Sequence, residues 1–569
     1  MSRPPLLENP WYYLENFEFV LKWIVQRYSD LLLPQEQEFI HAFLQAPQAS
    51  RGLLVRMIMR KGKLFRASKL QYQEIGSTPR AVQALIEQQW VVDDPVLTLS
   101  ELFSMLTKAE ITLLFGPALA TTQAATASKA IQLERLQVQF PDARRFSLWI
   151  DPSAQARPAP AFADTVYREQ TGDISERLRL MFFGNLHQDW SEFVLSELGL
   201  FTYEKVIFSS SSRAFQTRED IDTYLHLHRC KEQLTTSIAT GDTVELTGIR
   251  HAIGPRHDNE WLETRRSKLL FKLGQHHERF GMWPEALSCY QDSSYPGARA
   301  RSVRVLERAY RFDDALLLAQ AALQSPENEA EHQSLLRMLP RLLRRTGATA
   351  GARRTASEVP KIHLSLPTSA ARTRVEEQVR QYLDHAQAPV FYVENTLINT
   401  LFGLLCWDAI FTAIPGAFFH PFQQGPADLL HANFQTRRQP QLDACLAQLN
   451  SQQYKQTILE NFSRKSGIQS PFVAWGCISA EILNTALTCM PAQHLKITFA
   501  RLMQDLRSNR SGLPDLIQFW PVEQRYRMIE VKGPGDRLQD NQIRWLDYCH
   551  AHHIPVAVCY VQHQLPAEA

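Results

Sequence analysis

The C-terminal part of the chain alternates between apolar stretches and polar breaks in a pattern that few folds can accommodate. Strands are predicted at Leu513–Trp520, Tyr526–Lys532 and Pro555–Val561, and a helix at Gln539–Ala551 lies between the last two. Pro521–Arg525 is a short polar loop, so the first two strands should form a hairpin. The order strand, strand, helix, strand predicts one three-stranded half of a mixed sheet.

Three ionisable side chains fall at the open end of this predicted hairpin. Val531 separates Glu530 from Lys532, so both side chains point to one face of a strand. Folding the hairpin about the centre of its loop places Asp515 opposite Val531 or Glu530. Carboxylate oxygens suit Mg²⁺ or Mn²⁺, which polarise phosphate oxygens and lower the pKa of a bound water. Lys532 would hold the attacking water or offset charge in the transition state. The alternative is a solvated surface hairpin, because this short motif also occurs by chance.

The 569 residues are too many for one core, and a prior of roughly 150 residues per domain suggests three or four domains. Tracts of biased composition mark the expected boundaries: Ala118–Ala130, Pro152–Ala161 and Arg344–Arg374. The predicted division is an N-terminal helical region at 1–125, a linker at 126–165, a helical domain at 166–385 and an α/β domain at 386–569. In the last domain, long helices are expected at Tyr392–Thr412 and Gln493–Arg507.

The N-terminal region is predicted to hold a small winged-helix or SAP-like module. Helices are expected at Trp11–Tyr28, Leu53–Met59 and Ala81–Gln89, with a short extended piece at Leu64–Phe65. No acid interrupts the basic run between Arg51 and Lys69. Such a run favours contact with the DNA backbone, although a solvated face is the alternative. The residues expected to bind DNA here are Arg60, Lys61, Lys63 and Arg66.

The middle of the chain has repeat character. Leu273-Gly274, Ala286 and Tyr290 fall where a tetratricopeptide helix pair places its packing residues. Phe312-Asp-Asp-Ala315 echoes Trp283-Pro-Glu-Ala286 at an offset of 29 residues, shorter than the usual ~34. We therefore expect an irregular array of helical pairs, with unrelated amphipathic helices as the alternative.

Composition and motif searches exclude several classes of protein. A net charge of +2 is too small to indicate a nucleic-acid partner, so any basic surface must be local. The most apolar segment, Thr396–Phe419, is interrupted by Asn399, Asp408 and Pro415, which favours a buried helix over a membrane span. No secretory h-region, C-x-x-C pair or phosphate-binding glycine loop is found. These absences predict a cytoplasmic protein without a membrane partner, zinc finger or nucleotide cofactor.

A longer string in the C-terminal region is more specific than the short motif. It consists of Gly512-Leu-Pro-Asp515, Glu530-Val-Lys532-Gly533-Pro534, Asp536, Leu538, Gln542 and Trp545-Leu546. This string resembles the VRR-NUC branch of the PD-(D/E)XK nucleases, and most of all the Fanconi-associated nuclease family. That family has a SAP-like module, a tetratricopeptide-like domain and a C-terminal nuclease domain, the same order as expected here over essentially the full chain.

The resemblance implies roles for individual residues. Val393-Glu394, followed by Leu397, Leu401 and Cys406-Trp407-Asp408, is similar to the family's upstream metal-binding glutamate. Without the resemblance, Glu394 is a first-turn helix acid favoured by the dipole. The implied metal ligands are Glu394, Asp515, Glu530 and the carbonyl of Val531. Lys532 and Gln542 are implied as catalytic, and Arg507 and Arg537 as phosphate contacts or, alternatively, exposed ion-pair partners.

The resemblance also implies an activity. Family members are 5′-flap endonucleases and 5′-to-3′ exonucleases that use Mg²⁺ or Mn²⁺ in the repair of interstrand crosslinks, and we expect a monomer associated with the nucleoid if the host is bacterial. Two alternatives are a dimeric four-way-junction resolvase and an inactive scaffold for branched DNA. The sequence departs from the family in lacking the ubiquitin-binding zinc finger, and in having Asn541 where a basic residue is expected.

Overall fold

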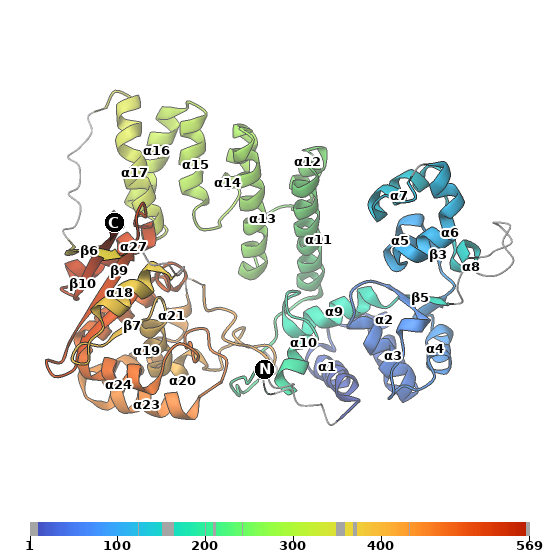
Figure 1. Ribbon diagram of the computed structural model, residues 1–569, viewed down its shortest axis with the longest axis horizontal. Helices are drawn as coiled ribbons and strands as arrows, with labels where there is room; N and C mark the ends of the chain where they lie inside the picture. Colours follow the sequence, from blue (N-terminus) through green and yellow to red (C-terminus); the bar gives the residue numbers. More distant parts are fainter. Residues whose placement is uncertain are drawn as a thin grey trace, which may run out of the picture. The chain divides into compact units, whose positions relative to one another are not determined.

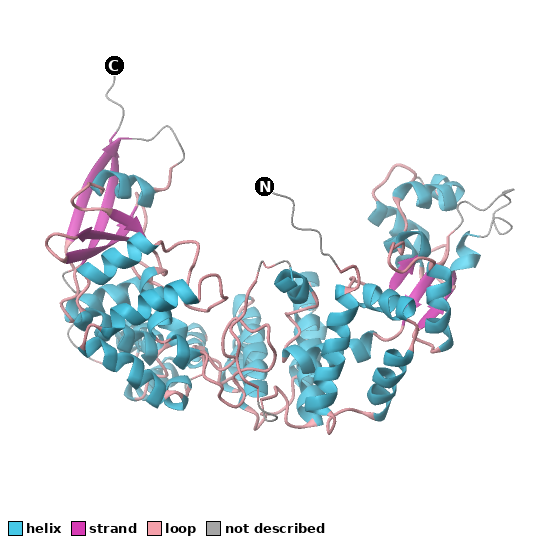
Figure 2. Cartoon of the chain, turned by 90° about the horizontal axis from the view of Figure 1, so that it is seen from below, coloured by secondary structure: helices cyan, strands magenta, loops and turns pink. Residues whose placement is uncertain are grey.

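The computed structural model describes residues 9–122, 124–150, 164–197, 199, 201–208, 212–241, 243–348, 359–367, 373–431 and 433–564. The chain divides into two compact units, and the helices and strands of both carry their labels in Figure 1. The first comprises Met1–Leu200 and Arg213–Ile221, and the second comprises Phe201–Ser212 and Asp222–Ala569. Most of the described chain is helical (Figure 2).

The first unit begins with helices closed by a small antiparallel sheet in the order β1-β5-β2. The predicted helix at Trp11–Tyr28 is confirmed as α1, and the two shorter helices and the extended piece are also found. The elements are α1 (Tyr12–Tyr28), α2 (Pro34–Gln45), α3 (Gln48–Ile58), β1 (Leu64–Arg66), the 3₁₀ helix η1 (Ala67–Lys69), α4 (Thr78–Glu87), β2 (Val91–Asp93), β5 (Val166–Glu169), α9 (Gly172–Phe183) and α10 (Ser191–Glu197).

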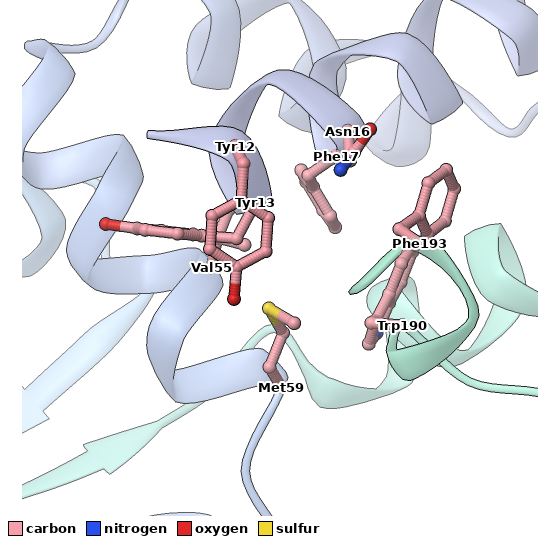
Figure 3. A pocket seen from close by; sticks show the side chains of 8 residues that line it. All are labelled: Tyr12, Tyr13, Asn16, Phe17, Val55, Met59, Trp190 and Phe193. Carbon is pink, nitrogen blue, oxygen red and sulfur yellow. The ribbon is translucent and has the colours of Figure 1, made fainter. Parts of the chain in front are cut away.

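Aromatic side chains from α1 and from the region of α10, together with Val55 of α3, surround a cavity of about 10 Å³ (Figure 3). Its walls include Tyr13, Phe17, Trp190 and Phe193. A space of this size holds at most about one water molecule, so it reflects packing of the core and not a ligand site.

A second, separate core follows in the first unit. It is built from β3 (Val96–Leu97), α5 (Leu99–Met105), α6 (Lys108–Thr121), α7 (Lys129–Gln137), β4 (Arg144–Arg145) and α8 (Phe146–Ile150). The expected linker at 126–165 is therefore wrong for this stretch, because Leu136, Phe146 and Trp149 are buried in the core. The Pro/Ala tract Pro152–Ala161 lies outside the described residues.

Helical pairs form the start of the second unit. They are α11 (Arg218–Thr240), whose first residues belong to the first unit, α12 (Thr243–Ala252), α13 (Glu260–Arg279), α14 (Trp283–Gln291), α15 (Ala298–Arg308), α16 (Phe312–Gln324) and α17 (Glu329–Arg345). A Cβ on Gly274 would lie 2.8 Å from the Tyr290 ring, which confirms the predicted packing of α13 on α14. The expected start of this domain at 166 is wrong, since β5 and the residues up to 200 belong to the first unit.

The C-terminal sheet has five strands in the order β6-β10-β9-β8-β7. Strands β6, β10 and β9 are parallel, whereas β8 and β7 are antiparallel to their neighbours, so the sheet is mixed as predicted. The strands are β6 (Lys361–Pro367), β7 (Val390–Tyr392), β8 (Leu516–Trp520), β9 (Arg525–Lys532) and β10 (Val556–Gln564). The two strands absent from the predicted pattern, β6 and β7, form its edges.

Helices cover both faces of this sheet. Helix α18 (Val375–Leu383) packs on one face through Val379. The larger core on the other face draws on the remaining helices: α19 (Leu397–Leu405), α20 (Trp407–Ile410), α21 (Phe434–Arg437), α22 (Gln439–Ala447), the 3₁₀ helix η3 (Gln448–Asn450), α23 (Gln453–Arg464), α24 (Ala480–Cys489), α25 (Ala492–Gln504), α26 (Leu506–Asn509) and α27 (Asp540–Ala551).

Two predicted long helices are interrupted. Tyr392, the first residue of the helix expected at Tyr392–Thr412, is instead the last residue of strand β7, and the helical part is divided into α19 and α20. The helix expected at Gln493–Arg507 breaks at Asp505, whose carboxylate accepts hydrogen bonds from the Arg507 and Ser508 amides and so starts α26. Among the helices that the structure describes, none combines the length and apolarity needed to cross a membrane.

Candidate active site

The β8–β9 hairpin brings the two predicted carboxylates together. Its register pairs Leu516 with Ile529, so the next step outward sets Asp515 beside Glu530. This pairing is one of the two that were predicted by folding the hairpin about the centre of its loop. Ile517 and Met528 belong to the larger core on one face, whereas Val531 packs on the opposite face. Alternation along the strands therefore directs Asp515, Glu530 and Lys532 to the same face.

The three side chains are buried, and their charges act on one another. Asp515 is 7% exposed, Glu530 1% and Lys532 7%. The backbone amide of Val531 donates a hydrogen bond of 2.9 Å to Asp515 Oδ2, and this bond fixes the carboxylate against β9. Lys532 Nζ lies 2.8 Å from Glu530 Oε1. The structure thus brings these three predicted residues together at the end of the hairpin.

Burial makes both acids unusually weak. Desolvation raises the pKa of Asp515 to about 6, although the hydrogen bond from Val531 opposes the shift. Desolvation and the neighbouring Asp515 charge raise the pKa of Glu530 to about 7, while Lys532 opposes the shift. The charge of Glu394 raises the pKa of both groups. Perturbed carboxylates that act on one another in a buried place are typical of functional sites.

The chemistry of the donors fits a hard divalent cation. Among the described residues, only the Lys532 ammonium, 2.8 Å from Oε1, lies close to the almost completely buried Glu530 carboxylate, and no donor reaches Oε2. A buried carboxylate oxygen without a donor is costly, and a divalent cation would supply the missing contact. No three Asp, Glu, His or Cys side chains within the described ranges are drawn together as a complete metal cage. The full ligand set of Glu394, Asp515, Glu530 and the Val531 carbonyl therefore stays a prediction.

Glu394 lies in the turn between β7 and α19, and its side chain is exposed. Its carboxylate accepts hydrogen bonds from the Tyr392 hydroxyl and from Asn395 Nδ2. Burial and the charges of Glu394, Asp515 and Glu376 raise the pKa of Tyr392, so the phenol stays protonated and can donate. Tyr392 was missed by the sequence reasoning, because the residue was assigned to a long helix and not to a strand.

The side chain of Gln542 makes its hydrogen bond within the first turn of its own helix. Its Oε1 accepts a hydrogen bond of 2.8 Å from the Gln539 amide at the start of α27. The neighbouring Asn541 packs against Gly512, which has a positive φ of +87° and whose Cβ, if present, would lie 2.7 Å from the Asn541 backbone. The start of α27 is therefore held close to the Gly512–Asp515 turn, but a catalytic role for Gln542 stays a prediction.

The two predicted phosphate contacts, Arg507 and Arg537, are both exposed. Arg507 lies on α26 with its guanidinium 5.7 Å from the ring centre of Tyr295 in the helical array. Arg537 lies in the loop between β9 and α27. Exposure leaves both cations available to a polyanion, and their role in DNA binding stays a prediction.

The basic N-terminal residues divide into two groups. Arg60, Lys61 and Lys63 are exposed, and Lys63 lies 3.6 Å from Asp173 across an exposed ion pair. Arg66 is different, because its guanidinium is bonded to Glu110 and Asp164 at 2.7 Å each. The structure thus gives Arg66 an internal structural role, which argues against the predicted contact with DNA.

Comparison with known families matches three parts of the chain. These are the "FAN1, HTH domain" over residues 11–92, the "Fanconi anemia-associated nuclease SAP domain" over residues 96–149 and the "VRR-NUC domain" over residues 449–563. The basic run lies in the first match, and the SAP match lies further along the chain than expected. It covers the second core of the first unit.

Full-length relatives and solved structures agree with these matches. The chain is 50% identical to the "Fanconi-associated nuclease 1 homolog" of Pseudomonas aeruginosa, over 98% of this chain and 97% of the relative. It is 23% identical to the human "Fanconi-associated nuclease 1" but covers only 62% of that protein. A crystal structure of "paFAN1 bound to 2nt 5'flap DNA with gap" superposes with a TM-score of 0.93 at 49% identity, covering 99% of this chain and all of the other.

One conclusion follows from the domain matches and from the similarity along almost the full length. It is supported by the buried Asp515, Glu530 and Lys532 at the end of the β8–β9 hairpin. The chain belongs to the Fanconi-associated nuclease family and is a DNA-hydrolysing enzyme.

Proposed function

We propose that the protein cuts 5′-flapped DNA as an endonuclease and degrades DNA from 5′ ends as an exonuclease, using Mg²⁺ or Mn²⁺, in repair that includes interstrand crosslinks. The observation that carries the catalytic part is the buried Glu530 carboxylate, which lies beside Asp515 and whose one close partner among the described residues is the Lys532 ammonium. Support for the substrate comes from the solved relative bound to 5′-flap DNA. We further propose that the protein acts as a monomer without a nucleotide cofactor, in the bacterial cytoplasm with the nucleoid if the host is a bacterium.

Each residue of the site would have its own role in catalysis. Asp515 and Glu530 would hold the divalent ion, which polarises a phosphate oxygen and lowers the pKa of a bound water. The Val531 amide keeps Asp515 oriented toward that position. Lys532 supplies a positive charge beside the scissile phosphate, where it offsets the charge that develops as water oxygen attacks phosphorus and the P–O bond to the leaving strand breaks. Burial strengthens these interactions because little water competes with them.

The test compares labelled 5′-flap, 3′-flap and four-way-junction DNA with and without Mn²⁺. The proposal predicts cleavage of the 5′ flap only when the metal is present. Equal cutting of 5′ and 3′ flaps would refute the polarity, and preference for an intact four-way junction would favour a resolvase. Tight binding of all three substrates without cleavage would indicate a scaffold.

A further inference from the structure

The residue after Glu394 has a rare backbone conformation. Asn395 has a φ of +53°, in the left-handed region that residues other than glycine seldom adopt. Asparagine tolerates this region better than most residues, because its short polar side chain forms local hydrogen bonds. Such outliers persist only where the surrounding structure enforces them, and they cluster at functional sites. Asn395 stands in the turn between β7 and α19, directly beside a predicted metal ligand.

The side chain of Asn395 connects two segments that are far apart in sequence. Its Oδ1 accepts a hydrogen bond of 3.1 Å from the Leu513 amide, in the Gly512–Asp515 turn. Its Nδ2 lies 3.3 Å from Glu394 Oε1 and donates to that carboxylate. One amide group therefore contacts the turn that ends at Asp515 and also the carboxylate of Glu394.

A second asparagine strengthens the connection. Asn399 is 5% exposed, and its Nδ2 donates both to the Asn395 carbonyl at 2.7 Å and to the Arg510 carbonyl at 2.9 Å. On the other side of Glu394, the Val393 amide donates to the Asp515 carbonyl at 2.8 Å. The residues on both sides of Glu394 are thus bonded to the segment 510–515.

We propose that Asn395 is a positioning residue that holds Glu394 and Asp515 in register, so that both carboxylates serve one divalent cation. The inference rests on the proposed metal site and adds a residue that touches neither substrate nor metal. It acts through Glu394, by donating to its carboxylate, and through the Leu513 amide, by fixing the path of the chain toward Asp515. Residues that orient metal ligands in this way typically contribute about 10- to 100-fold to metal affinity or activity.

Asn395→Gly isolates the side chain from the backbone conformation, because glycine adopts a positive φ without strain. The matched control is Gln524→Gly, at an exposed residue with a φ of +50° in the turn between β8 and β9. Mn²⁺ is titrated by calorimetry into the full-length, DNA-free proteins, and turnover on a 5′-flap substrate is measured against Mn²⁺ concentration. DNA affinity is measured in Ca²⁺.

Asn395→Gly is expected to lower Mn²⁺ affinity and turnover by about 10-fold or more, and to leave DNA affinity within about twofold, because no DNA-contacting residue changes. Gln524→Gly should match the wild type in all three measurements. If Asn395→Gly does not fold, Asn395→Asp is measured instead, since it keeps an oxygen for the Leu513 amide and loses the N–H group that donates to Glu394.

Wild-type Mn²⁺ affinity and turnover in a folded Asn395→Gly protein, or in Asn395→Asp where it replaces that variant, would overturn the inference. A lower melting temperature with an unchanged Mn²⁺ titration would also overturn it, because that result describes a purely structural residue. Failure of the wild-type protein to bind Mn²⁺ or to cut the flap would instead refute the proposed metal site itself, so the two failures are distinguishable.

Discussion

Glu36 in the first unit and Glu530 in the C-terminal sheet are buried to the same degree, with exposures of 0% and 1%. They differ in the number of their partners. Glu36 is bonded to Arg177 at 2.6 Å and to Arg218 at 2.7 Å, and it accepts the Leu33 amide at the start of α2. Glu530 has one close partner among the described residues, the Lys532 ammonium at 2.8 Å, and no backbone amide donates to it.

This difference separates a structural charge from a functional one. A fold stabilises a buried carboxylate by pairing it with cations and hydrogen-bond donors. A buried carboxylate with an oxygen left unpaired costs folding energy, and such a cost is tolerated where a ligand completes the contacts. In the N-terminal unit, the buried carboxylate of Glu36 is fully paired. In the β8–β9 hairpin, the buried carboxylate of Glu530 is not.

The largest effect is expected from removing the metal ligands. Asp515→Ala or Glu530→Ala should abolish cleavage while DNA binding stays nearly intact, because the carboxylates serve chemistry more than docking. Gel-shift and cleavage assays on the same 5′-flap substrate measure both properties. Glu36→Gln provides the contrast. It should lower the free energy of unfolding by about 3 kcal/mol, as expected for a broken buried pair, and leave turnover per folded molecule unchanged. Wild-type turnover in either alanine variant would contradict the assignment of the site.

Lys532 should have the next largest effect. Its replacement by alanine is expected to lower turnover by about 10²-fold or more, as for other groups that stabilise charge in a transition state. Lys532→Arg should not restore activity, because a planar guanidinium does not reproduce a point ammonium in a space shaped around it. Single-turnover rates on the flap substrate distinguish these outcomes, and a fully active arginine variant would be inconsistent with the role.

The raised pKa values of Asp515 and Glu530, about 6 and about 7, make metal binding dependent on pH. The folded, metal-free protein holds these protons more tightly than the unfolded chain, so their contribution to stability is present at low pH and is lost as the pH rises through about 4 to 7. Mn²⁺ must displace the same protons. Its affinity should therefore increase by up to about tenfold per pH unit for each proton displaced. Calorimetric titrations below pH 6 and near pH 8 test this, and a pH-independent affinity would show that the carboxylates do not bind the ion.

Local sequence predicted the hairpin and its charged end well, because a short polar loop between two apolar strands leaves few registers. It also predicted the packing of Gly274 against Tyr290, which depends on residue size at fixed spacing. It failed where long-range partners decide the outcome. The partners of Arg66 lie 44 and 98 residues away in sequence, so nothing near Arg66 indicated that its charge is satisfied. The edge strands β6 and β7 were missed for the same reason, since only their pairing in the sheet makes them strands.

The exposed N-terminal cations should affect DNA binding, whereas the internally paired Arg66 should affect stability. Charge reversal at Arg60, Lys61 and Lys63 together should weaken binding to all duplex-containing substrates about equally. It should also make the slope of log affinity against log salt concentration shallower, by up to ~0.9 for each phosphate that is no longer neutralised. Arg66→Ala should instead lower the melting temperature, because it leaves Glu110 and Asp164 without their shared partner. Affinity measured across a salt series tests both. An unchanged slope in the triple variant would place the DNA elsewhere.

The smallest effect should come from Arg507, and Arg501 is its matched control. Arg501 is 2% exposed, and its guanidinium is bonded to Glu329 at 3.0 and 2.6 Å, so its loss should destabilise the fold. Arg507 is exposed on the neighbouring helix, where its charge can meet a phosphate. A terminal 5′-phosphate carries more negative charge than an internal phosphodiester and forms stronger charge-assisted hydrogen bonds. We therefore expect a 5′-phosphate to improve cutting near that end, and Arg507→Ala to reduce this advantage without changing the melting temperature. Because Asn541 stands where a second cation was expected, the advantage should be modest, and its full retention in Arg507→Ala would show that another residue selects the 5′ end.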